Sequence, residues 1–255
     1  MYEEAQKILE YLPIRRNTPE NDYINHLWQA FSTLDEGELV ARPFAVMPFH
    51  LLFMMAVQYK VLRISKAYKQ STNLFFSGVG GRSKAQLLSE RRSVFDIALI
   101  NERTIPEIFQ LIGLGSATIQ KIKDLIDGRN DNFAHAKGGI ERGFEKKIDE
   151  YINTAELIQK CCLESNQKVI SSWLSEIQNG DDIAQFFETH FFDSYLSPRD
   201  FGDIAESLFL AKKLNFDRWR QIVSKGLEVA HDQTILALRA IISENGSEIL
   251  ELLIS

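Results

Sequence analysis

The sequence predicts an all-α protein, a helical bundle followed by a smaller helical C-terminal region. Long stretches place apolar residues three and four positions apart, which is the spacing of amphipathic helices. Only six prolines and fourteen glycines interrupt the 255 residues. The share of hydrophobic residues, 45%, beside 25% charged residues is typical of a folded chain that buries a core. We expect a first domain over residues 1–164 and a second over residues 165–255.

The first two predicted helices are delimited by prolines. Residues 2–12 have helical periodicity, and Pro13 stops this helix because proline cannot continue the backbone hydrogen bonds. Thr18 followed by Pro19 predicts the start of a second helix. Threonine caps a helix N-terminus, and proline fits the first helical position.

A long central helix is predicted to end near Tyr68. Pro43 and Pro48 frame its entry, and residues 49–57 are apolar nearly all round, as expected for the central helix of a bundle. We interpret His50 in this apolar setting as a core histidine with satisfied hydrogen bonds rather than as a catalyst.

Residues 71–84 predict the clearest loop, because polar residues and glycines are frequent there. This segment lacks the Gly-Lys-Ser/Thr ending and the βαβ surroundings of a phosphate-binding loop, so we do not assign nucleotide binding to it. Further helices are expected over residues 93–101, 104–113, 116–126 and 140–163.

The C-terminal region predicts shorter helices, over residues 169–177, 182–192, 199–214, 217–230 and 234–253. Its acidic residues match no established metal-site spacing, and we interpret them as helix caps. Aromatic residues recur there at core-like positions. A packing or partner-recognition domain is the simplest interpretation.

Chemically capable residues gather in one segment between two predicted helices. Arg129 supplies a planar set of donors that suits phosphate oxygens and stabilises extra negative charge in a phosphorane-like transition state. His135 exchanges a proton near pH 7. Asn130 offers donors and acceptors. Asp131 and Asn132 stand four and three residues before His135, close enough on a helix to contact its ring.

This set suits RNA cleavage, because the 2′-hydroxyl of RNA attacks the neighbouring phosphate once a base and an anion stabiliser are positioned. Arg129 and His135 are six residues apart, which places them about 240° from each other around an ideal helix. They share one face only if the helix is distorted or a second copy of the chain contributes. Gly128 and Gly138 favour distortion, since glycine weakens a helix by roughly 1 kcal/mol relative to alanine.

The pattern of an arginine, a polar residue, a short gap and a histidine between small residues resembles the R-x(4–6)-H signature of HEPN-domain ribonucleases. Here the gap holds five residues, and Asn130 takes the polar position after Arg129. Ala134 and Ala136 flank His135. The order of helix, motif, glycine turn and long helix also resembles the family's arrangement.

The resemblance implies a HEPN-like helical bundle that forms a homodimer, with two motifs facing each other across a composite active site. It implies that Arg129, Asn130 and His135 occupy the family's catalytic positions. RNA would be cut without metal or cofactor, leaving a 2′,3′-cyclic phosphate and a 5′-hydroxyl. Asp131 and Asn132 are supporting residues inferred from spacing alone. Similar proteins often act as toxins or antiphage effectors, which implies an antitoxin or regulatory protein as a further partner.

A structural interpretation of the same residues stays open. Asn130 or Asp131 caps a helix, and His135 is an ordinary polar residue near a turn. The corresponding function is a non-catalytic helical adaptor that keeps the fold and binds RNA or another protein.

The net charge of −6 opposes an RNA enzyme unless basic residues are concentrated locally. The predicted RNA-binding residues are basic side chains of the central helix and the segment after it, namely Lys60, Arg63, Lys66, Lys69, Arg82 and Lys84. Tyr59 and Tyr68 stand beside them for base stacking. A solvated helix face is an equally open interpretation.

No segment predicts export or membrane insertion. The N-terminus lacks the basic and apolar regions of a signal peptide, and the most apolar run, residues 51–57, is too short to cross a bilayer. Cys161 and Cys162 are adjacent, which suits neither a disulfide framework nor a zinc site. We expect a cytoplasmic protein.

Overall fold

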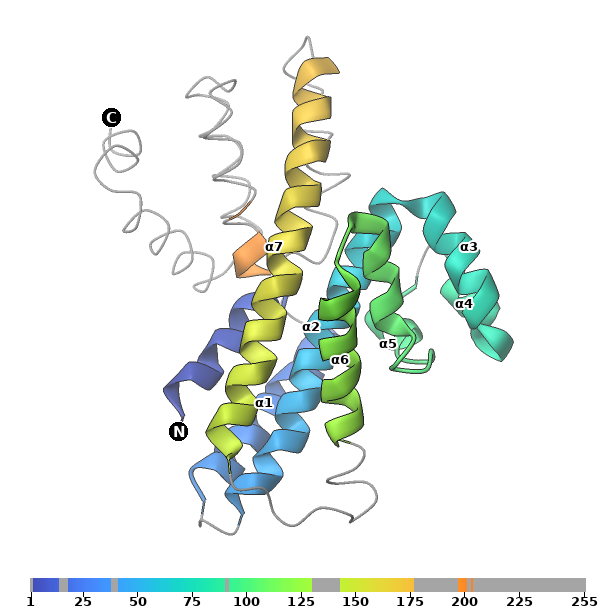
Figure 1. The fold of residues 1–255 in the computed structure, drawn as a ribbon. Coiled ribbons are helices and arrows are strands. Elements are labelled where there is room, and N and C mark those ends of the chain that lie inside the picture. Colours follow the sequence, from blue (N-terminus) through green and yellow to red (C-terminus); the bar gives the residue numbers. More distant parts are fainter. Residues whose placement is uncertain are drawn as a thin grey trace, which may run out of the picture. The chain divides into compact units, whose positions relative to one another are not determined.

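The computed structural model confirms the all-α class. It describes residues 2–13, 18–37, 41–89, 92–129, 143–176, 197–200 and 203, and within these residues all regular secondary structure is helical (Figure 1). With η for 3₁₀ helices, the elements are η1 (Glu3–Tyr11), α1 (Pro19–Asp35), η2 (Arg42–Ala45), α2 (Val46–Ala67), α3 (Lys69–Val79), η3 (Gly81–Ser83), α4 (Lys84–Leu87), α5 (Val94–Ile97), η4 (Ile105–Ile112), α6 (Ser116–Arg129) and α7 (Phe144–Glu176).

The chain separates into two compact units. The first comprises residues 1–12 and 17–161, and the second comprises residues 13–16 and 162–255. Helix α7 belongs to both, so the helices predicted separately over residues 140–163 and 169–177 are one helix.

Little of the second unit beyond α7 is described. A helical turn begins at residue 198, where Ser197 and Asp200 cap each other. The Ser197 hydroxyl lies 2.8 Å from Asp200 Oδ2, and the Asp200 amide donates to Ser197 Oγ at 3.2 Å. This start agrees with the predicted beginning of the helix over residues 199–214. The other predicted C-terminal helices lie outside the described residues.

The N-terminal elements of the first unit follow their sequence signals. Thr18 caps α1, and its side chain accepts a hydrogen bond from the Asn21 amide at 3.3 Å. The first predicted helix is present but is the 3₁₀ helix η1, which buries Ala5 and Ile8 completely. Local capping and proline geometry therefore predict the start of α1 correctly.

Helix α2 is the centre of the first unit. It packs against α1, α3, α5 and η4, and it buries Phe49, Leu52 and Phe53 completely. Each such side chain contributes roughly 1.5–3 kcal/mol to the hydrophobic stabilisation of the core. Residues 42–65 are long and apolar enough to cross a membrane, but 89% of the most apolar window is buried inside the structure. This burial is what the core helix of a soluble protein has.

The predicted loop over residues 71–84 is wrong for most of its length, because α3 continues to Val79. Thr72 and Phe76, one helical turn apart, are buried. The Thr72 hydroxyl lies 3.0 Å from the Tyr68 carbonyl and 3.3 Å from the Ser65 carbonyl, which ties α3 to the end of α2. The helix ends at Gly80, where a Cβ would meet the Phe76 carbonyl at 2.7 Å.

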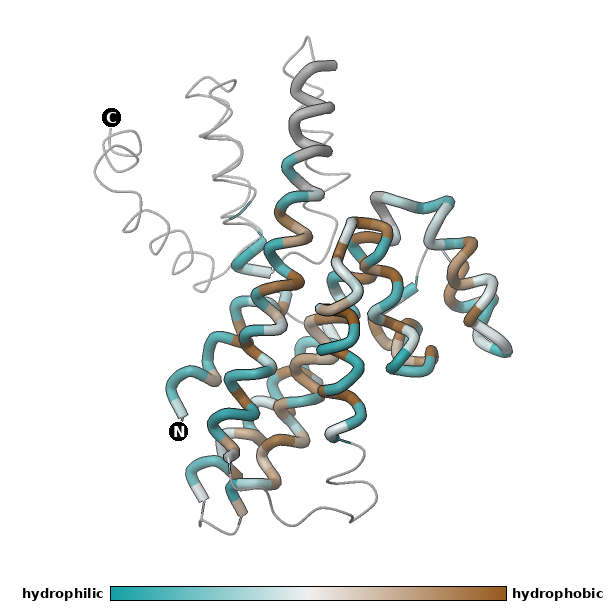
Figure 2. Tube along the Cα trace, viewed as in Figure 1, coloured by the Kyte–Doolittle hydropathy of each residue, from teal (hydrophilic) through white to brown (hydrophobic). Residues whose placement is uncertain are grey.

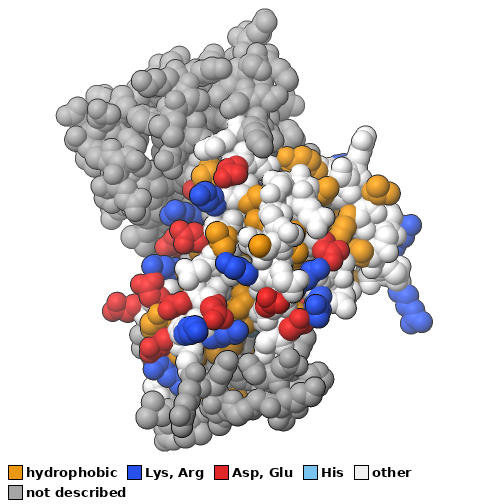
Figure 3. Space-filling view, viewed as in Figure 1, with side chains coloured by type: hydrophobic (Ala, Val, Ile, Leu, Met, Phe, Trp, Pro, Cys, Tyr) orange, Lys and Arg blue, Asp and Glu red, His pale blue; other side chains and the backbone are white. Residues whose placement is uncertain are grey.

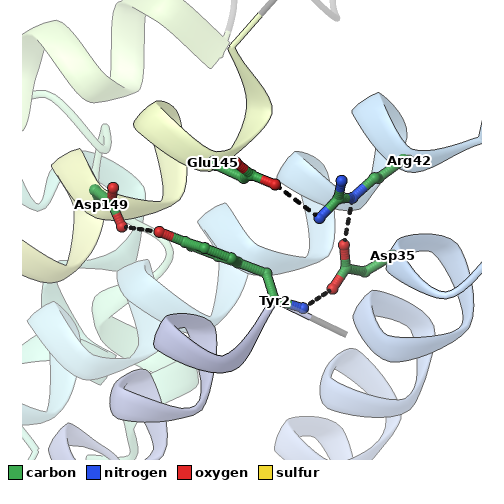
Figure 4. Close-up of polar contacts among 5 residues, drawn as sticks. All are labelled: Tyr2, Asp35, Arg42, Glu145 and Asp149. Atoms are coloured by element: carbon green, nitrogen blue, oxygen red, sulfur yellow. Dashed lines mark hydrogen bonds and ion pairs between the residues drawn. The ribbon is translucent and has the colours of Figure 1, made fainter. Parts of the chain in front are cut away.

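A polar cluster fixes the beginning of α7 against the N-terminal helices (Figure 4). The buried carboxylate of Asp35 accepts from the Tyr2 amide at 2.5 Å and from Arg42 Nε at 2.8 Å. Arg42 also pairs with Glu145 of α7 at 3.2 Å. The Tyr2 hydroxyl donates to Asp149 of α7 at 2.7 Å. The hydrogen bond to Asp149 is the main reason why the pKa of Tyr2 is raised to about 12.

Helix α6 packs against η4, and Tyr151 of α7 packs against Phe53 of α2. Hydrophilic and hydrophobic residues alternate along α6 and along the coloured part of α7 (Figure 2). The predicted helix over residues 116–126 is confirmed, and α6 continues through Gly128 to Arg129. The turn before α6 uses Gly113 at φ 88°, a left-handed conformation that glycine adopts at little cost. Cys161 of α7 contacts the Ile112 carbonyl at 3.4 Å, which joins α7 to η4.

Candidate functional site

Arg129 is the described part of the predicted catalytic motif. It is the last residue of α6, and its side chain is 18% exposed. Asn130, Asp131, Asn132 and His135 lie outside the described residues. The convergence of Arg129 and His135 therefore stays a prediction.

Arg129 pairs with Glu102, which lies in the turn before η4. The guanidinium donates to Glu102 Oε2 at 2.5 Å. Two further ion pairs join α6 to the same stretch, from Arg103 to Asp127 at 3.0 Å and from Lys123 to Glu107 at 2.7 Å. These three contacts fix the C-terminal end of α6, and with it the position of the guanidinium.

His50 of α2 lies on the buried side of this ion pair. Its Nδ1 is 3.0 Å from the Tyr151 hydroxyl, and its Nε2 is 4.0 Å from Glu102 Oε2, the oxygen that binds Arg129. A separation of 4.0 Å is too long for a hydrogen bond. The burial of His50 in the core is confirmed. The expectation that its hydrogen bonds are satisfied is not, because Nε2 has no hydrogen-bond partner among the described residues.

His50 is neutral at physiological pH. Burial, together with the smaller effect of the positive charges of Arg129 and Lys147, lowers the pKa of His50 from 6.5 to about 3. A neutral imidazole carries its proton on one nitrogen only. When the Tyr151 hydroxyl donates to Nδ1, the proton is on Nε2, which then points an unpaired donor towards Glu102.

Lys147 of α7 adds a second cation beside Arg129. Its side chain is 16% exposed, and its ammonium group lies 3.2 Å from Glu150 Oε2. The same ammonium would be 3.3 Å from a Cβ at Gly128, the residue before Arg129. Glycine at this position therefore leaves room for the lysine beside the end of α6.

The described site thus combines the Arg129–Glu102 ion pair with a second cation, Lys147, and with the neutral His50 and its partner Tyr151. Arg129 Nε is buried and has no hydrogen-bond partner among the described residues. Such a set of donors suits an anion, and a guanidinium binds phosphate oxygens through two parallel hydrogen bonds. The arrangement can bind and stabilise a phosphate group if the ion pair between Glu102 and the Arg129 guanidinium breaks.

One member of the predicted RNA-binding set is misplaced. Lys60 is only 3% exposed. The three-residue spacing does not keep side chains on one face of a 3.6-residue helix, so the pattern does not decide which of these side chains are exposed. A side chain this buried does not reach an RNA backbone in this structure, and the RNA-binding role of the set stays a prediction.

The other members differ in exposure. Lys69, Arg82 and Lys84 are exposed, Arg63 is partly exposed, and the Lys66 side chain lies outside the description. On the face drawn in Figure 3, basic and acidic side chains are interspersed over the described residues. The exposed basic residues that remain lie on α3, η3 and α4, at one side of the first unit (Figure 1).

Three residues of the site had no sequence signal that linked them to Arg129. Glu102 precedes it by 27 residues and looks like an ordinary turn residue. Tyr151 fits the apolar repeat of α7, and Lys147 lies one turn before it, as solvated lysines commonly do. The only usable signal was His50, because a histidine in an apolar helix needs a buried polar partner.

Among the described residues, no group of three or more histidine, cysteine, aspartate or glutamate side chains is arranged to hold a metal ion. Cys161 and Cys162 are buried and form no disulfide. Comparisons of the chain with protein-family models, with curated proteins and with solved structures found no match. The resemblance to HEPN-domain ribonucleases rests on the motif residues and the order of the elements around them.

Proposed function

We propose that this chain is a metal-independent endoribonuclease in which Arg129 stabilises the scissile phosphate. The observation that carries the proposal is the placement of Arg129 at the fixed end of α6, with Lys147 beside it. Both cations retain some exposure, so a phosphodiester can approach them. Preorganised cations of this kind stabilise the negative charge that develops during phosphate transfer.

In this proposal the nucleophile is the 2′-hydroxyl of the RNA. His135 is the general base or acid, and Asn130 orients the substrate or the guanidinium. Asp131 and Asn132 hold the imidazole of His135. A homodimer brings two such motifs together in one composite site, and the products are a 2′,3′-cyclic phosphate and a 5′-hydroxyl.

The biological setting follows from the resemblance. We infer a cytoplasmic toxin or antiphage effector that an antitoxin or regulatory protein holds in check. A reducing compartment also suits two cysteines that form no disulfide. The C-terminal region would bind that regulator or extend the bundle.

A second candidate function is a non-catalytic helical adaptor, and the ion pair of Arg129 with Glu102 favours it. A guanidinium that is held at 2.5 Å by a carboxylate is already used in the fold. An adaptor would keep this contact permanently and would bind RNA or protein elsewhere.

Cleavage separates the two functions. Purified chain is incubated with mixed RNA in EDTA, beside Arg129→Ala and His135→Ala, with Arg103→Ala as a control for loss of an ion pair at the same end of α6. We expect each motif variant to lose at least about a hundredfold in rate, as the loss of a preorganised donor or an acid–base group does. Arg103→Ala should stay near the parent rate. Folded motif variants that cut RNA undiminished would remove the assignment, and absence of cleavage by every protein would favour the adaptor.

A further inference from the structure

The Glu102 carboxylate lies between two donors that can use the same oxygen. Its Oε2 accepts from Arg129 at 2.5 Å and lies 4.0 Å from His50 Nε2. Arg129 and Glu102 keep 18% and 27% of their side-chain surface exposed, whereas His50 is fully buried. A solvent-borne anion therefore meets the ion pair from outside, while His50 stands on the inside.

His50 is held in a fixed orientation. The Tyr151 hydroxyl lies 3.0 Å from Nδ1, and the two rings meet edge to face at 5.6 Å. Tyr151 is itself fully buried between Phe49 and Phe53 of α2, with ring centroids 5.9 Å and 5.1 Å away. Because neither ring has room to turn freely, Nε2 keeps its direction towards the carboxylate.

Two buried nitrogen atoms at this place have no partner in the described structure, His50 Nε2 and Arg129 Nε. Buried donors are almost always paired in native proteins, so two such atoms on either side of one carboxylate indicate a second arrangement. In that arrangement a ligand anion receives the guanidinium hydrogen bonds, and the carboxylate is free to approach the imidazole.

We propose that Glu102 is an exchangeable internal anion, which occupies Arg129 until a phosphate group displaces it and then moves to His50 Nε2. The inference rests on the proposed function, since it assigns Arg129 to a phosphate group. The Lys147 ammonium next to Gly128 favours the incoming phosphate, because it adds a second positive charge on the same side. His50 and Tyr151 are positioning residues: His50 faces the carboxylate, Tyr151 holds His50, and neither contacts the phosphate.

The exchange is tested by the binding of two probes, inorganic phosphate and an oligoribonucleotide with 2′-O-methyl groups throughout. Affinities are measured for the parent chain, Glu102→Gln, His50→Leu and the double variant. We expect Glu102→Gln to bind phosphate about tenfold more tightly, since one charge-assisted competitor is gone. His50→Leu should bind phosphate about tenfold more weakly, because the displaced Glu102 carboxylate then has no imidazole donor to move to. In the double variant the His50→Leu effect should disappear.

A conservative replacement separates positioning from packing. Glutamine at position 50 offers one acceptor and one donor, so His50→Gln should restore most of the parent affinity when Glu102 is present. If His50→Leu does not fold, Tyr151→Phe takes its place, with a smaller loss that again depends on Glu102. Equal effects with and without the Glu102 carboxylate, no effect in either background, weaker binding by Glu102→Gln, or no binding of either probe by the parent chain would each overturn the exchange.

The two probes also separate this inference from the ribonuclease proposal. The methylated oligonucleotide has no attacking hydroxyl, so its binding does not depend on catalysis. A chain that shows the coupling but cuts no RNA keeps the exchange and loses the nuclease assignment. If the chain cuts RNA but the effects of the Glu102 and His50 variants on probe affinity are additive, the exchange is excluded and the ribonuclease proposal stands. If the effects of the Glu102 and His50 variants depend on each other with both probes, free phosphate is enough to trigger the exchange. If they depend on each other with the oligonucleotide only, RNA is the trigger.

Discussion

The imidazole of His50 lies 3.0 Å from the Tyr151 hydroxyl, although 101 residues separate them in the chain. This contact joins the central helix α2 to α7 at the point where Glu102 and Arg129 also meet. It places a neutral histidine against an ion pair in the interior of the first unit. The local chemistry of the candidate site depends on this neutrality.

The neutral state of His50 predicts acid sensitivity. In the unfolded chain the imidazole has a pKa of 6.5, whereas in the folded chain the pKa is about 3. Below pH 6.5 the unfolded state therefore binds a proton that the folded state rejects, and stability is lost as the pH falls towards 3. The free energy of unfolding should fall by up to about 1.4 kcal/mol per pH unit in this window.

Urea unfolding at a series of pH values measures this effect, with His50→Gln as the control because glutamine does not titrate. The carboxylates titrate in both proteins, so the difference between the two curves isolates the histidine. The stability of His50→Gln should decline less steeply below pH 6.5. Parallel curves would show that His50 is not buried in its neutral form.

Removal of the Tyr151 hydroxyl should destabilise the fold without disturbing its packing. In Tyr151→Phe the His50 Nδ1 loses its partner in a fully buried place, which costs about 1–3 kcal/mol. The matched control is Tyr23→Phe, since Tyr23 is 37% exposed whereas Tyr151 is fully buried. Thermal or urea unfolding of both variants tests the prediction, which fails if they are equally stable.

Much of the fold was readable from the sequence, because its signals are local. Thr18 with Pro19 fixed the start of α1, and the apolar run around Phe49 marked the central helix. The error at α3 has a local cause too. Polar residues before Gly80 suggested a loop, whereas Thr72 and Phe76 form a buried stripe that only packing against α2 makes decisive.

The candidate site was less readable, because its contacts are long-range. The sequence singled out Arg129 by its neighbours along the chain. Nothing in that pattern indicated that Glu102 would pair with it, or that Lys60 would turn inwards. Both depend on how the helices are arranged around α2. His50 could be assigned to the core, but its partner Tyr151 looked like one more apolar residue of α7.

The cluster at the start of α7 should contribute unequally to stability. Loss of Arg42 in Arg42→Leu leaves the buried Asp35 carboxylate without its counter-charge, which should cost about 3 kcal/mol. Glu145→Gln removes a partner that is 56% exposed and should cost under about 1 kcal/mol. Urea unfolding compares the two variants. Similar losses would contradict the difference in burial.

The exposed basic residues should account for part of any RNA affinity. If Arg82 and Lys84 each contact one phosphate, the double replacement by alanine lowers the salt dependence of binding by about 1.4 in the slope of log K against log salt. Lys60→Met is the control, since Lys60 is buried and its loss should alter unfolding rather than this slope. An unchanged slope for the double variant would exclude these residues from the interface.

The central claim is that Arg129 stabilises a phosphodiester that the RNA's own 2′-hydroxyl attacks. The most direct measurement identifies the product ends after incubation in EDTA, with a single RNA and its 2′-O-methyl counterpart as substrates for the parent chain and for Arg129→Ala. The account predicts a 2′,3′-cyclic phosphate and a 5′-hydroxyl from the parent chain on unmodified RNA, and almost none from the other three combinations. A 5′-phosphate product, cleavage of the methylated strand, or undiminished cleavage by a folded Arg129→Ala would contradict it.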